Sequence, residues 1–105
     1  MISSENLVLS LSRVRFYSAG DEGAFFHWLN GIKCVLRHEG VGTELQLHVD
    51  SGAVDEASLR ELIAFFWRYG VPMEQLAVLD RPAYSSWLRN QKAFWFASMF
   101  GTASH

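Results

Sequence analysis

Hydrophobic and polar residues alternate in short stretches of the chain, which is the pattern of half-buried β-strands. Three such stretches cover residues 7–12, 32–36 and 45–49. A short apolar run at residues 75–79 predicts a fourth strand. Residues 40–43, which contain two glycines, separate the second stretch from the third and predict a hairpin loop.

One register of this predicted hairpin gives each strand a consistent apolar face. It sets Leu36 opposite Leu47, with the polar residues on the other face of the sheet. The same register sets Glu39 opposite Glu44, and like charges directly opposite each other are unfavourable. A loop that begins earlier in the chain is therefore the alternative.

Helical spacing of apolar residues predicts three helices. The first follows Asp21 and Glu22 and ends near Gly31, and the second follows Asp55 and Glu56 and ends before Gly70. Acidic residues are favourable in the first turn of a helix, and glycine is common just after its end. A third helix is expected after a turn at residues 80–82 and is expected to reach about residue 99.

The predicted order of elements is β-α-β-β-α-β-α, which defines an α+β protein. Its first six elements match the split β-α-β arrangement of ferredoxin-like folds. The sequence therefore predicts a four-stranded antiparallel sheet with two helices on one face and an added C-terminal helix. We expect a single domain over residues 1–105, with frayed termini at residues 1–6 and 101–105.

Composition and charge narrow the class of protein. Hydrophobic residues make up 50% of the 105 residues and charged residues 19%, which is typical of a globular domain. A net charge of −2 without a run of basic residues makes nucleic acid an unlikely partner. The N-terminus resembles no secretory signal, no apolar stretch is long enough to span a membrane, and Cys34 is the only cysteine. These features predict a cytoplasmic protein.

Residues suited to catalysis or metal binding do not form a recognisable constellation. The four histidines lack the spacing that brings two ring nitrogens to one metal ion, and Cys34 lies within a predicted strand. Aspartates that precede predicted helices are explained by capping. The sequence thus predicts no catalytic residue, metal or cofactor; it leaves enzymatic activity open and favours a non-enzymatic protein.

Large aromatic side chains are the most informative feature of the composition. They make up 14% of the chain, more than a small core readily encloses. We therefore expect a surface that contacts another protein or a second copy of the chain, because aromatic residues and arginine are common binding anchors. The residues predicted for this interaction surface are Phe26, Trp67, Arg89, Phe96 and Phe100.

A second hypothesis places function on the face of the sheet that the helices leave open. The alternation in the predicted hairpin puts Arg37, Gln46 and His48 on that face. Three such polar groups would suit a small-molecule-binding or weakly catalytic domain if they converge on a pocket. The hypothesis fails if the three side chains diverge in the folded protein.

Overall fold

A computed structural model describes residues 6–12 and 14–101 of the chain. The chain divides into two compact units, Met1–Val71 and Pro72–His105, which we call the N-terminal unit and the C-terminal unit. The expectation of a single domain over residues 1–105 stays a prediction. The predicted fraying falls mostly on residues 1–5 and 102–105, which lie outside the described residues.

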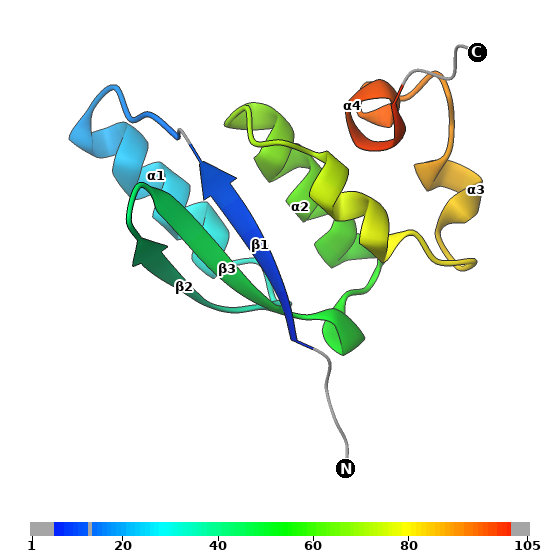
Figure 1. Cartoon of the computed structure of the whole chain (residues 1–105), viewed down its shortest axis with the longest axis horizontal. Coiled ribbons are helices and arrows are strands. Elements are labelled where there is room, and N and C mark those ends of the chain that lie inside the picture. The colour runs from blue at the N-terminus through cyan, green and yellow to red at the C-terminus, as the bar shows by residue number, and fades with distance from the viewer. Residues whose placement is uncertain (1–5, 13, 102–105) are drawn as a thin grey trace. The chain divides into compact units, whose positions relative to one another are not determined.

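The sheet of the N-terminal unit has three antiparallel strands, β1 (Asn6–Ser12), β2 (Val35–Val41) and β3 (Glu44–Asp50). Their order is β1-β3-β2, so β3 is the central strand and both of its neighbours are edge strands (Figure 1). A short 3-10 helix, η1 (Ser51–Ala53), follows β3. Alternating apolar residues in β1 and β3 place leucines on one face, as in Leu9 opposite Leu47.

The register of the hairpin between β2 and β3 differs from the predicted one. Val41 pairs with Glu44, so the turn contains only Gly42 and Thr43. Gly42 adopts a φ of 63°, a left-handed conformation that glycine adopts without steric cost. This tighter turn brings Gln46 opposite Glu39, and the unfavourable pairing of two glutamates does not occur.

The predicted pairing of Leu36 with Leu47 is also wrong. The register shifts between Val35 and Arg37, which leaves Leu36 at a bulge with a relative exposure of 56%. His38 takes the place opposite Leu47. A bulge adds one residue to one strand, and alternation alone does not reveal it.

Two long helices, α1 (Ala19–Asn30) and α2 (Glu56–Arg68), begin at side-chain caps. The Ser18 hydroxyl accepts a hydrogen bond from the Asp21 N–H at 3.0 Å, and the Asp55 carboxylate accepts one from the Ser58 N–H at 2.8 Å. Each cap satisfies a backbone donor that the first helical turn leaves without a partner. Gly31 ends α1, as the sequence predicts.

Both long helices cover the same face of the sheet and pack against each other (Figure 1). The rings of Phe25 and Phe65 lie 4.8 Å apart between their centroids, and Trp28 Nε1 donates to Glu61 Oε1 at 2.7 Å. The resulting core is almost entirely apolar. Its fully buried side chains in this unit include Leu9, Leu11, Phe25, Leu29, Leu47, Leu59, Leu62, Phe65 and Phe66.

The predicted fourth strand is wrong, and with it the four-stranded ferredoxin-like sheet. Residues 75–79 lie in a 3-10 helix, η2 (Glu74–Leu79), and the described sheet has three strands. Leu76 and Leu79 are buried whereas Val78 is 63% exposed, so the apolar contacts recur every three residues, the period of a 3-10 helix. Residues 76–79 are all apolar, and a continuous apolar run has no alternation from which a strand could be distinguished from a helical segment.

The predicted third helix is interrupted in the structure. Its region contains two short helices, α3 (Ser85–Leu88) and α4 (Phe96–Phe100). Between them Asn90 Oδ1 accepts a hydrogen bond from the Lys92 N–H at 3.0 Å. Asparagine stabilises such turns because its short side chain competes with the helical hydrogen bonds of the backbone.

Candidate functional site

Three residues of the predicted interaction surface come together in the C-terminal unit. The Arg89 guanidinium carbon lies 4.6 Å from the centroid of the Phe100 ring, and the Phe96 and Phe100 rings are 5.4 Å apart. Both rings are half-buried. Arg89 Nε also donates to Asp80 Oδ2, which holds the guanidinium in place while its side chain stays 56% exposed. We call Arg89, Phe96 and Phe100 the C-terminal aromatic cluster.

A second group of rings lies in the same unit. Phe94 is 52% exposed and packs edge-to-face on Trp95, with centroids 5.0 Å apart. Trp95 contacts Trp87 at 6.0 Å, and its Nε1 donates to the Leu88 carbonyl at 2.9 Å. Short helices thus leave several large rings in contact with both protein and solvent.

The other two residues of the predicted interaction surface, Phe26 and Trp67, lie in the N-terminal unit. Phe26 is half-buried because its ring packs on Phe25 at 4.9 Å and on His38 at 5.0 Å. Trp67, at the end of α2, is 50% exposed. The structure therefore divides the five predicted residues between the two units rather than gathering all of them within one.

The second predicted site lies on the open face of the sheet. Arg37 is opposite His48, and Gln46 lies two residues before His48 on the same strand, so the three residues share one face. Glu39 Oε1 lies 3.3 Å from Arg37 Nη1 and 3.2 Å from His48 Nε2. The cation and the histidine therefore converge on a carboxylate of the chain itself.

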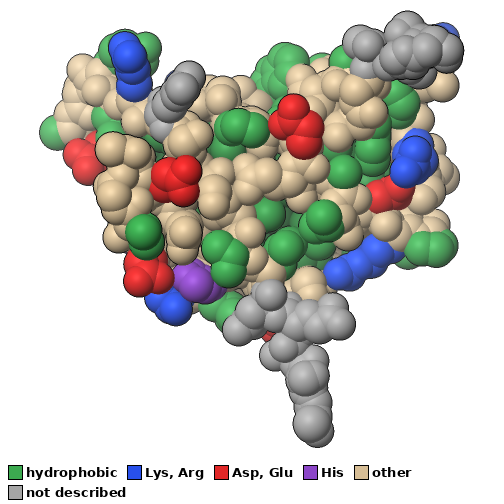
Figure 2. Space-filling model, in the orientation of Figure 1, with side chains coloured by type: hydrophobic (Ala, Val, Ile, Leu, Met, Phe, Trp, Pro, Cys, Tyr) green, Lys and Arg blue, Asp and Glu red, His purple; other side chains and the backbone are tan. Residues whose placement is uncertain are grey.

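The surroundings of these groups form an open, mixed surface. Figure 2 shows hydrophobic, acidic and basic side chains interspersed over the side of the sheet that the long helices do not cover. Side chains of Arg37 and Glu39 are 61% and 47% exposed. Water competes strongly for polar groups at such exposure, which weakens an ion pair.

Nucleophilic and metal chemistry gain no support from the described residues. Burial raises the pKa of the Cys34 thiol above its ordinary value, although a hydrogen bond with the Ser58 side chain opposes part of that rise. A thiol held protonated in this way is a poor nucleophile. Within residues 6–12 and 14–101, histidine, cysteine and carboxylate side chains do not gather in groups of three that could hold a metal ion.

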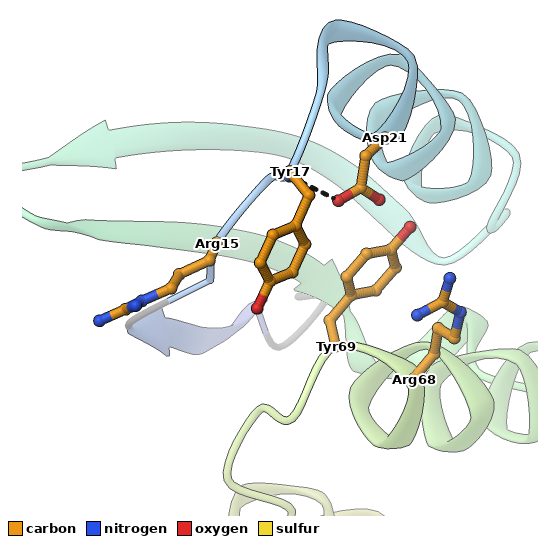
Figure 3. Close-up of a pocket in the computed structure, with 5 residues that line it drawn as sticks. All are labelled: Arg15, Tyr17, Asp21, Arg68 and Tyr69. Atoms are coloured by element: carbon orange, nitrogen blue, oxygen red, sulfur yellow. Dashed lines mark hydrogen bonds between the residues drawn. The ribbon is translucent and has the colours of Figure 1, made fainter.

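The structure also contains a pocket that sequence reasoning missed. It has a volume of about 440 Å³ and lies in the N-terminal unit, between the segment that leads into α1 and the end of α2 (Figure 3). We name it the tyrosine–arginine pocket after its lining, which is Arg15, Tyr17, Asp21, Arg68 and Tyr69. More than 40 residues of sequence separate its two halves, and their approach depends on the packing of α1 against α2.

Comparisons of the chain with protein-family models, with curated proteins and with solved structures give no match. Among the helices of the described residues, none combines the length and the apolar character required to cross a bilayer.

Proposed function

We propose that the protein is a non-enzymatic interaction module that forms a homodimer through the C-terminal aromatic cluster. The single observation behind this proposal is the contact of Arg89 with the half-buried rings of Phe96 and Phe100. Aromatic residues and arginine dominate binding energies at protein interfaces when they occupy the centre of the contact.

A second copy of the chain is the occupant that fits this cluster. A two-fold interface requires one patch to be complementary to itself. The cluster contains both partners of a cation–π contact, and Asp80 beside Arg89 adds the opposite charge. In the proposed dimer, the guanidinium of each copy faces an aromatic ring of the other.

Two further parts of the proposal concern chemistry and compartment. A non-enzymatic role is supported by the protonated, buried state that Cys34 favours. A cytoplasmic location is proposed because a chain with a single cysteine lacks the disulfide framework that is common in small secreted domains.

Light scattering coupled to size-exclusion chromatography tests the homodimer. We expect the wild type to elute as a dimer at micromolar concentrations, and Phe96→Asp, Phe100→Asp and Arg89→Gln to shift the population toward monomer. Arg89→Gln keeps the rings in place and separates loss of contact from loss of folding. A cooperative thermal transition by circular dichroism establishes that each variant is folded.

A matched control is Leu36→Asp, which introduces the same charge at an exposed apolar position of the N-terminal unit. It is expected to leave the dimer intact. The proposal is overturned if the wild type is a monomer, or if Leu36→Asp dissociates the dimer while the three cluster variants do not.

Small-molecule binding on the open sheet face is the second candidate function. The convergence of Arg37 and His48 on Glu39, beside Gln46, favours it. Such a site would bind a ligand that replaces Glu39 as the partner of the two basic groups. NMR titration with small carboxylates tests it, because no shift at the His48 ring would contradict this candidate.

A further inference from the structure

The tyrosine–arginine pocket presents two aromatic rings that are held in different ways. Tyr69 is fixed from behind, since its ring packs on Phe25 at 4.8 Å and on Phe65 at 5.2 Å. Tyr17 is 88% exposed, and Asp21 Oδ2 accepts a hydrogen bond from its backbone N–H at 3.0 Å. Both tyrosines line the pocket drawn in Figure 3. The exposed ring of Tyr17 can stack on a planar ligand, and the half-buried ring of Tyr69 gives the pocket a fixed aromatic wall.

Two arginines and one aspartate are the charged residues of the described lining. The guanidinium carbon of Arg68 lies 5.3 Å from the centroid of the Tyr69 ring, which orients the cation at the pocket wall. Arg15 approaches from the other side, and in Figure 3 its guanidinium points outward. As far as the described residues show, neither arginine forms an ion pair with a carboxylate of the chain.

Among the described residues of the lining, Asp21 is the one acid, and the local backbone engages its carboxylate. Its Oδ2 accepts from the Tyr17 N–H, while the Ser18 hydroxyl accepts from the Asp21 N–H. Asp21 therefore acts as a positioning residue that ties Tyr17 to the start of α1. Arg68 is left available for a ligand from solvent.

We propose that the tyrosine–arginine pocket binds a small aromatic anion, a planar ring that bears a phosphate or a carboxylate. The ring lies against Tyr17 and Tyr69, and the anionic group pairs with Arg68, because a guanidinium matches the geometry of both anions. A volume of about 440 Å³ lies within the usual range for small-molecule sites, roughly 300–1,000 Å³. All described residues of this site lie in the N-terminal unit, whereas the C-terminal aromatic cluster lies in the C-terminal unit.

NMR titration of the isotope-labelled chain tests the site and distinguishes the two kinds of anion. Adenosine monophosphate and 4-hydroxybenzoate serve as the phosphate and carboxylate probes, with adenosine and inorganic phosphate as the counterparts that lack one half of the ligand. We expect at least one aromatic anion to shift the amide signals of Tyr17 and Tyr69 at millimolar concentrations. Adenosine and inorganic phosphate are expected to bind more weakly than that anion.

Three variants separate the contributions of ring and charge. Arg68→Gln is expected to weaken binding of the preferred anion roughly tenfold, the usual effect of losing a charged hydrogen bond. Tyr17→Ala is expected to weaken it as well, and folding should be retained because this side chain is almost fully exposed. The control is Arg60→Gln on the same helix, since Arg60 pairs with Glu56 and does not line the pocket.

Either of two results would overturn the proposal. One is the absence of shifts at the pocket with both aromatic anions. The other is an equal loss of affinity in Arg68→Gln and Arg60→Gln, which would show general attraction of anions to the surface instead of a site.

Discussion

In the N-terminal unit the rings of Phe25, Phe65 and Phe66 are fully buried, whereas every aromatic ring described in the C-terminal unit keeps some exposure. The first unit has a sheet and helices of 12 and 13 residues, and the second has helical segments of four to six residues. Long elements can surround a ring on all sides. Short helical segments contact a ring from one side only. Aromatic residues therefore form a buried core in the N-terminal unit and partly exposed rings in the C-terminal unit.

The helices of the two units also differ in how their N-termini are capped. Ser18 and Asp55 cap the two long helices with their side chains. None of η2, α3 and α4 has a hydrogen bond from a side-chain cap at its N-terminus. The short helices therefore depend more on their tertiary contacts, because an isolated helix of this length is unstable.

The largest expected loss of stability comes from removing a buried aromatic ring, compared with an exposed one. Phe25→Ala should lower the free energy of unfolding by about 3–5 kcal/mol, because it leaves a cavity between α1, α2 and the sheet. Phe94→Ala in the C-terminal unit should lower it by less than about 1 kcal/mol, since half of that ring is already exposed. Urea denaturation followed by circular dichroism measures both. Equal losses would contradict the difference between the units.

A smaller effect is expected at the helix caps. Ser18→Ala removes the acceptor for the Asp21 N–H and should lower the free energy of unfolding by about 1 kcal/mol. Ser86→Ala, an exposed change in the short helix α3, should alter it by less than about 0.5 kcal/mol. Thermal unfolding of the two variants compares them directly, and a larger effect at Ser86 would argue against the role of side-chain capping.

The smallest effect concerns the dependence of stability on pH. Hydrogen bonds from the Ser58 N–H and hydroxyl hold the pKa of Asp55 below its ordinary value. A carboxylate with a lowered pKa in the folded state contributes stability above the pKa of the unfolded state, and this contribution is lost as pH falls through the folded pKa. The stability advantage of wild type over Asp55→Asn should thus shrink below about pH 4.

Urea midpoints at neutral and acidic pH test this prediction. Asparagine also caps helices well, so the variant keeps the hydrogen bond to Ser58 and removes only the charge. The control is Ser86→Ala, an exposed change in the C-terminal unit that removes no titratable group and should not change the pH dependence. A constant difference between wild type and Asp55→Asn across the whole range would contradict the prediction.

Strands β1 and β3 and the two long helices could be predicted from their apolar periods. The second predicted strand, at residues 32–36, was placed too early, because β2 spans Val35–Val41 and includes residues assigned to the loop. The spacing of Phe25 and Leu29 indicates the buried side of α1, and the alternation of Leu45, Leu47 and Val49 indicates that of β3. The predicted hairpin register was wrong, but it correctly placed Arg37 on the same face of the sheet as His48. The predicted and observed registers of these strands differ by two residues, and such a shift leaves each side chain on the same face. That face assignment followed from alternation alone.

Other features could not be read in this way. The run at residues 75–79 fits two periods equally, and its identity as η2 depends on which of its leucines find contacts. Residues 82–99 have the apolar content of a helix, yet the turn at Asn90 divides them. Tyr17 and Tyr69 show no pattern that relates one to the other.

Sequence by itself determined the strands β1 and β3, the presence of the two long helices, the cap at Asp55, and the sides on which most of their residues point. The start of α1 was predicted wrongly, because Ser18 caps this helix and Asp21 and Glu22 lie inside its first turn. Such local features depend on interactions between residues close together in the sequence, so they can be inferred from the sequence alone. Only the tertiary structure decided that the sheet has three strands, that Leu36 lies at a bulge, and that Arg68 and Tyr69 share a pocket with Tyr17. Such features depend on contacts between distant segments, whose free energy arises only when the helices and strands pack together.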